Sequence, residues 1–269
     1  MFLHRTFSLV VLLLCGIWAA PANAECVQAE AIVHQTYPTA THAGGSYRLD
    51  EYAIALPGGD ADDAQQVVCK SWPAHPEFIL ALVPLMASGS DDEHSGDLDI
   101  LVLDSKSLKV QQRVRLKGYM NDDAVRITGL ALDTARYQLA PGTPAFGIRK
   151  TLEGSSRANP FGEVDLALFA TIDGKLRAVL DGMVVSRNNG EWDTNCAGTF
   201  SDSHVVLTMG KTATHGLVDI DVAGTREESS NYLDKQQQCQ EKKGTPGKIQ
   251  AQLRYDGQKY VVPKDMVAL

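Results

Sequence analysis

The side chains best suited to ligand chemistry lie between Gly190 and Cys196, where two carboxylates flank an aromatic ring. Glu191 and Asp193 stand on either side of Trp192, a combination found in carbohydrate sites. Two carboxyl groups about 5–10 Å apart in one pocket could act together on a glycosidic bond. The competing interpretation is structural, because an aromatic residue beside a disulfide often packs as a plug at the end of a β layer. We favour the structural interpretation and keep Glu191, Trp192 and Asp193 as candidate binding residues.

A second concentration of carboxylates lies between Asp50 and Asp104. This segment holds twelve acids and a single base, Lys70, a net charge of -11, whereas the whole chain carries -8. The acids are Asp50, Glu51, Asp60, Asp62, Asp63, Glu77, Asp91, Asp92, Glu93, Asp97, Asp99 and Asp104. The following segment, residues 105–118, has five bases and no acid.

Two interpretations of this charge segregation remain open. In the first, the acids form a solvated surface, and Asp97 and Asp99 pair across strands with Arg113 and Arg115, each pair contributing at most about 1 kcal/mol. In the second, the acids form a patch that attracts a cationic partner. Its candidate binding residues are Asp91, Asp92, Glu93, Asp97 and Asp99.

The loop from Asp91 to Asp99 also resembles a calcium loop in its spacing. Asp91, Glu93, Asp97 and Asp99 fall at oxygen-ligand positions, and Gly96 falls where a tight turn is required. However, Val102 occupies the twelfth position, where an EF-hand needs a bidentate Glu, and a strand pattern follows. The sequence therefore argues against an EF-hand and leaves a nonclassical calcium loop as a weak hypothesis.

Recognisable catalytic and cofactor motifs are absent from the sequence. It has no G-x-S-x-G, H-E-x-x-H, P-loop or G-x-G-x-x-G pattern, and its histidines are scattered. We therefore expect no cofactor and favour a binding protein over an enzyme. The acidic composition argues against a nucleic-acid partner.

The first 24 residues predict a secretory signal peptide. An apolar run from Phe7 to Ala20 is too short to span a bilayer, and Ala22 to Ala24 form a small-x-small cleavage site. We expect cleavage after Ala24 and a periplasmic or secreted protein. No later apolar run is long enough to cross a membrane.

Four cysteines remain after this cleavage, and an even number in an exported chain predicts disulfides. Three connectivities are open. We favour Cys26–Cys69 and Cys196–Cys239, because each bridge then closes a 43-residue separation within one end of the chain. Each would contribute about 3–4 kcal/mol in the chain-entropy picture.

The elements that must position these residues are mainly β-hairpins. The clearest hairpin runs from Val164 to Val185; the parity of its apolar residues predicts a three-residue loop, residues 172–174, with Gly174 at positive φ. Two more hairpins are expected over residues 98–116 and 249–262, the latter with a two-residue turn at residues 256–257. Residues 229–243 predict the only convincing helix, ended by Gly244.

The expected fold is all-β, made mainly of antiparallel hairpins in a sandwich or a partly open barrel, with one or two short helices. We expect one β-rich domain over residues 25–269, with a soft division near residues 151–163. The functional hypothesis is an exported binding protein that recruits or inhibits a cationic protein through an acidic face. The alternatives are an envelope hydrolase that uses the carboxylates near Trp192 and a calcium-stabilised structural module.

Overall fold

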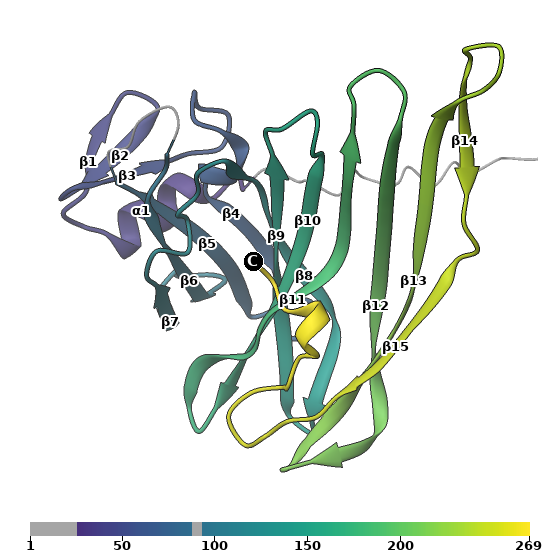
Figure 1. Cartoon of the computed structure of the whole chain (residues 1–269). Coiled ribbons are helices and arrows are strands. Elements are labelled where there is room, and N and C mark those ends of the chain that lie inside the picture. Colours follow the sequence, from purple (N-terminus) through teal and green to yellow (C-terminus); the bar gives the residue numbers. More distant parts are fainter. Residues whose placement is uncertain (1–25, 88–92) are drawn as a thin grey trace, which may run out of the picture.

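The computed structural model describes residues 26–87 and 93–269, which form two antiparallel sheets (Figure 1). Strands make up 63% of the structure and helices 6%, so the predicted all-β class is confirmed. The predicted signal peptide lies outside the described residues, and so do Asp91 and Asp92.

The first sheet has seven strands in the order β1-β2-β3-β5-β6-β7, with β4 also paired to β5. Its strands are β1 (Thr41–Ala43), β2 (Ser46–Leu49), β3 (Tyr52–Ala55), β4 (Val68–Ser71), β5 (Phe78–Met86), β6 (Gly96–Asp104) and β7 (Val110–Leu116). A helix, α1 (Ala29–Thr36), and a 3-10 turn, η1 (Asp63–Gln65), accompany them. The central strands β5 and β6 are buried along almost their whole length; β5 reads as a continuous apolar run, whereas β6 also buries Asp97 and Asp99.

The second sheet has eight strands in the order β14-β13-β12-β11-β10-β9-β8, with β15 also paired to β13. Its strands are β8 (Val125–Ala140), β9 (Thr143–Gly154), β10 (Phe161–Ile172), β11 (Lys175–Trp192), β12 (Gly198–Thr214), β13 (Leu217–Leu233), β14 (Cys239–Lys243) and β15 (Gly247–Leu253). A final 3-10 turn, η2 (Lys264–Met266), follows. The sheets therefore divide between β7 and β8.

Three apolar clusters hold these layers together. One lies between the sheets and joins β5 and β6 to β8, β9 and β10; within it Phe146 contacts both Trp72 and Phe169, at centroid distances of 5.3 and 5.9 Å. The second lies between α1 and the other face of the first sheet. The third lies within the second sheet, where side chains of β8 approach those of β12 and β13. Each fully buried Leu or Ile contributes about 1.5–3 kcal/mol, so these clusters dominate stability.

The predicted three-residue loop of the central hairpin is wrong. Thr171 pairs with Leu176 and Ile172 with Lys175, which leaves a two-residue turn, with φ of 52° at Asp173 and 73° at Gly174. The positive φ at Gly174 is confirmed. The parity argument failed because the extra residue lies within the strands: the register shifts between Leu168 and Phe169, and this bulge returns the apolar side chains to one face.

The predicted helix over residues 229–243 is also wrong. The segment forms the end of β13, a turn and all of β14, with Leu233 paired to Cys239. A helix that is polar all round buries little apolar surface. Pairing with β12 instead satisfies the backbone of β13 at this end.

The last predicted hairpin has the wrong turn. Tyr255 bridges to Tyr260, so four residues lie between them instead of two, and Asp256 accepts hydrogen bonds from the N–H groups of Gln258 and Lys259. Tyr260 is 1% exposed; its N–H donates to Val179 and its hydroxyl to the carbonyl of Val218. The chain thus leaves the hairpin pattern to bury this tyrosine between β11 and β13.

Both predicted disulfides are confirmed. Cys26 is bonded to Cys69 and Cys196 to Cys239, each across a sequence separation of 43 residues. The first bridge ties the segment before α1 to β4. The second ties the loop between β11 and β12 to the start of β14.

Candidate functional site

Asp99, a candidate binding and calcium residue, lies in the interior of the first sheet. It stands opposite Arg115, whose Nε donates to Oδ1 at 2.8 Å and whose Nη2 donates to Oδ2 at 2.9 Å. Arg113 also donates to Asp99, and the Tyr37 hydroxyl donates to Oδ2 at 2.7 Å. The side chain of Asp99 is fully buried. These four hydrogen bonds give Asp99 a structural role, because they connect β6 to β7 and to the residue that follows α1.

Asp97, two residues earlier, is engaged in a similar way. Its carboxylate accepts the backbone N–H of Gly118 at 2.9 Å and the Tyr52 hydroxyl at 3.4 Å, and the residue is 9% exposed. The expected cross-strand pairing with arginine therefore holds for Asp99 alone. Of the other candidates, Glu93 is exposed, and Asp91 and Asp92 lie outside the described residues.

A group of at least three His, Cys, Asp or Glu side chains that could hold a metal ion is not found within residues 26–87 and 93–269. Asp97 and Asp99, two of the four calcium candidates, already have other partners. The nonclassical calcium loop therefore stays a prediction that concerns Asp91 and Glu93.

The structure separates the three candidates around Trp192. Asp193 accepts the N–H groups of Asn195 and Cys196 at 2.9 and 2.8 Å, which organises the loop after β11. These backbone hydrogen bonds, with that of Asn195 the largest cause, lower the pKa of Asp193. Glu191 and Trp192 are consecutive strand residues, so their side chains point to opposite faces of the sheet.

Glu191 belongs to a part of the second sheet that projects beyond the apolar clusters. This part, which we call the blade, comprises residues 186–192 of β11, 198–204 of β12, 225–233 of β13 and 239–243 of β14 (Figure 1). None of its residues belongs to the three clusters. The disulfide Cys196–Cys239 joins its two hairpins. The disulfide therefore stabilises the blade, whose two faces are not covered by an apolar cluster.

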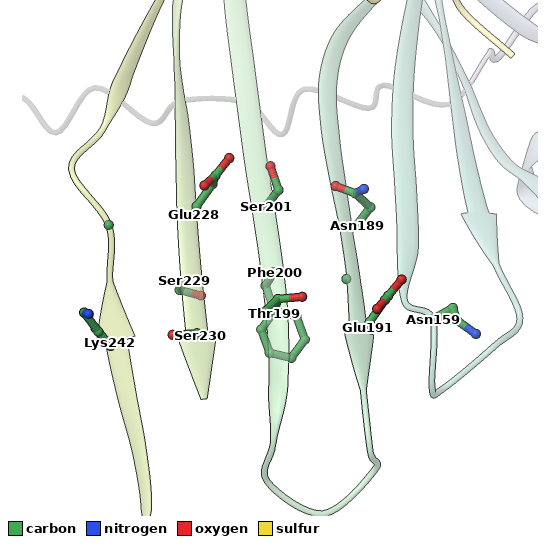
Figure 2. A pocket seen from close by; sticks show the side chains of 12 residues that line it. Asn159, Asn189, Glu191, Thr199, Phe200, Ser201, Glu228, Ser229, Ser230 and Lys242 are labelled. Carbon is green, nitrogen blue, oxygen red and sulfur yellow. The ribbon is translucent and has the colours of Figure 1, made fainter. Parts of the chain in front are cut away.

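One face of the blade carries an open polar trough of about 700 Å³ (Figure 2). Strand register arranges its side chains in two rows that cross the strands. The first row is Glu191, Thr199, Ser230 and Lys242, and the second is Asn189, Ser201 and Glu228. Because directly paired residues share a face, all seven side chains point to the same side.

The trough has more negative than positive charge. Glu191, Glu228 and Lys242 are its only charged lining residues, and all three are exposed. In the described part of the chain, neither glutamate side chain has a hydrogen bond or an ion pair. Sequence reasoning singled out Glu191 but missed Glu228, because only the pairing of β12 with β13 brings the two strands together.

A second polar cavity, of about 660 Å³, contains a histidine that sequence reasoning set aside. His94 Nδ1 lies 3.0 Å from Asp122 Oδ1 and 3.1 Å from Arg126 Nη1. A carboxylate that orients an imidazole is one part of a general-base site. Within the described residues, no hydroxyl or thiol is hydrogen-bonded to His94, so the nucleophile of such a site is missing. No local pattern linked these residues, since 28 positions separate His94 from Asp122.

Comparison with protein-family models, with curated protein sequences and with solved structures found no match to this chain. In the part that the structure describes, no helix has both the length and the apolar character needed to cross a membrane.

Proposed function

We propose that this protein is an exported binding protein that holds a cationic protein partner in the trough of the blade. The observation that carries this proposal is the pair Glu191 and Glu228, two exposed carboxylates with no ion pair of their own. Each of them could accept a lysine or arginine side chain of a partner, one on either side of β12. The charge therefore favours a basic surface, and attraction between exposed charges would speed the encounter.

The construction of the trough also suits binding. Apart from Phe200 and two glycines, its uncharged lining residues carry short hydroxyl and amide side chains, which lose little conformational freedom when a partner arrives. The disulfide Cys196–Cys239 braces the strands before binding. Such preorganisation lowers the entropy lost on association.

The arrangement supports binding over the envelope-hydrolase alternative. That alternative uses Glu191 and Asp193 in one pocket beside Trp192. Asp193 is instead committed to backbone N–H groups of its own loop, and Trp192 lies on the opposite face from Glu191. The two carboxylates therefore do not form an acid–base pair around one substrate.

The proposal is tested with immobilised mature protein and an envelope extract at low ionic strength. A basic protein should be retained and released by salt, because exposed charges are screened within about 10 Å at 0.1 M salt. The retained protein is then purified and titrated against the wild type and variants by calorimetry. Glu191→Gln with Glu228→Gln should weaken binding at least about tenfold, the effect of losing about 1.4 kcal/mol, and Lys242→Gln should strengthen it.

The matched control is Glu227→Gln, which removes an exposed carboxylate one residue from Glu228 on the opposite face of β13. This variant should bind as the wild type does. Retention of no basic protein, or equal affinity for the double variant and the control, would contradict the proposal.

A further inference from the structure

The other face of the blade carries a cavity of different character. It is an open hollow of about 630 Å³ next to the disulfide Cys196–Cys239, and Trp192 and Phe200 are among its lining residues. Arg157 and Asn231 supply polar groups at its border. We call this cavity the tip pocket. The tip pocket lies on the opposite face of the sheet from the trough. The inference drawn from it does not depend on the function proposed for the trough.

A glycine next to the tip pocket lets the Phe200 ring lie directly on the backbone. Gly198 is paired with Trp192 on one side and with Asn231 on the other. A Cβ at Gly198 would lie 2.7 Å from the carbonyl oxygen of Glu191 and 3.1 Å from the Phe200 ring. The Phe200 ring therefore occupies the space over the bare backbone of Gly198, and Phe200 and Trp192 line the tip pocket from neighbouring strands.

A second glycine positions one of these walls. Gly190 is paired with Phe200, and a Cβ there would approach Phe200 Cδ1 to 2.6 Å. The phenyl ring thus lies against backbone on two strands. A ring held in this way presents a fixed aromatic surface to a ligand.

The charge at the tip pocket is positive. Among the residues that the structure describes, Arg157 is the only charged one that lines the pocket, and no carboxylate does. Its guanidinium makes no hydrogen bond or ion pair with the rest of the described chain, and the residue is exposed. A free guanidinium presents a planar fork of donors that matches a carboxylate in geometry and charge.

We propose that the tip pocket binds a small planar aromatic molecule that carries a carboxylate. Its ring would lie in the pocket against Trp192 and Phe200, where offset or edge-to-face contacts contribute about 0.5–1.5 kcal/mol beyond burial. Its carboxylate would meet Arg157. The cavity has the volume of typical small-molecule sites, which span roughly 300–1,000 Å³. Arg157 disfavours a cationic ligand by repulsion.

The test uses indole-3-carboxylate as the probe and its uncharged amide, indole-3-carboxamide, as the comparison. Both are titrated by calorimetry into the oxidised mature protein, with Trp fluorescence as a second readout. The acid should bind at least about tenfold more tightly than the amide, because a charge-assisted hydrogen bond contributes about 1.5–3 kcal/mol. Arg157→Gln should remove this preference while leaving the affinity for the amide unchanged.

Two further variants make the result specific to the pocket. Trp192→Phe should weaken binding of both probes, and Lys242→Gln, on the opposite face, should change neither. Arg157 is exposed, so its substitution tests the proposal even if a change at Trp192 impairs folding. The inference is overturned if acid and amide bind equally, if neither saturates the protein at millimolar concentration, or if only a peptide with a terminal aromatic residue binds.

Discussion

Two buried aspartates, one in each sheet, have opposite surroundings. Asp99 on β6 accepts hydrogen bonds from Arg113, Arg115 and Tyr37. Asp165 on β10 is as deeply buried, with a side chain 3% exposed, yet neither of its carboxyl oxygens has a hydrogen-bond partner among the described residues. The nearest cation is Lys150, whose Nζ lies 3.8 Å from Oδ2.

The difference lies in how the available donors are distributed. Burial alone would raise the pKa of Asp99, but hydrogen bonds from Arg115, Arg113 and Tyr37 outweigh burial and lower it. For Asp165, burial and then the neighbouring Glu163 raise the pKa to about 7. Glu163 itself accepts hydrogen bonds from the guanidinium of Arg187 and from the N–H of Leu269. Burial is thus common to both aspartates, and the number of donors decides which one stays charged.

The largest expected effect is the loss of Asp99. The substitution Asp99→Ala leaves Arg113 and Arg115 beside a cavity without their counter-charge. Removing one partner of a buried ion pair destabilises a protein by about 3–5 kcal/mol, and we expect a fall of this size in the free energy of unfolding in urea. The control Asp62→Ala removes an exposed acid from the same sequence segment and should change little. A loss at Asp99 no greater than at Asp62 would break the comparison.

Replacement of Asp165 should act in the opposite direction. Asp165→Asn keeps the shape and cannot ionise, so it avoids the unfavourable burial of a charge without donors. We expect a gain in unfolding free energy near pH 8. The full shift of the pKa from 3.8 to about 7 corresponds to about 4 kcal/mol at about 1.4 kcal/mol per unit, and solvent screening should reduce the gain to about 2–4 kcal/mol. The gain should vanish near pH 4, where the side chain at position 165 is neutral in the folded wild type as well as in the variant. Destabilisation near pH 8 would show that Asp165 has a partner in solution.

The two aspartates should also affect opposite ends of the curve of stability against pH, Asp99 at low pH and Asp165 at higher pH. The folded pKa of Asp165, about 7, exceeds the ordinary value of 3.8, so its contribution to stability is lost as pH rises between these values. The folded pKa of Asp99 is below its ordinary value, so its contribution is lost as pH falls below about 4. Calorimetric melting from about pH 3 to 8 should therefore show Asp165→Asn flattening only the upper limb.

The smallest expected effect concerns the two arginines that hold Asp99. Arg115 uses two nitrogens on the carboxylate, and Arg113 uses one. A lysine cannot reproduce a two-nitrogen contact, so Arg115→Lys should lower the unfolding free energy by about 1 kcal/mol and Arg113→Lys by less. Urea unfolding of both variants measures the difference. Equal losses would mean that the contacts are equivalent in solution.

Local patterns predicted an element well where apolar and polar residues alternate along a strand. The hairpin expected over residues 98–116 is present as β6 and β7, and residues 110–116 of β7 alternate in burial. Prediction failed at α1, whose eight residues carry too weak a pattern, and at residues 229–243. That polar segment becomes strand only because β12 supplies its hydrogen-bond partners.

The candidate site was predicted only in part, for a physical reason. Composition marked Glu191 and Trp192 together, but strand alternation sends their side chains to opposite faces. Counting charges could not separate the buried Asp99 from the exposed Glu93, because each acid contributes equally to net charge. Burial depends on which strands meet, and composition carries no record of that.

The amino-acid sequence by itself determined the extended character of the chain, because alternation is a property of neighbouring residues; it favoured one of three disulfide connectivities, which the structure confirms. Tertiary structure alone decided where the bulge in β11 lies, which aspartate receives donors, and that Glu191 and Glu228 share one face of the sheet on either side of β12. These outcomes depend on contacts between residues far apart in sequence. Such contacts are set by the packing of whole sheets.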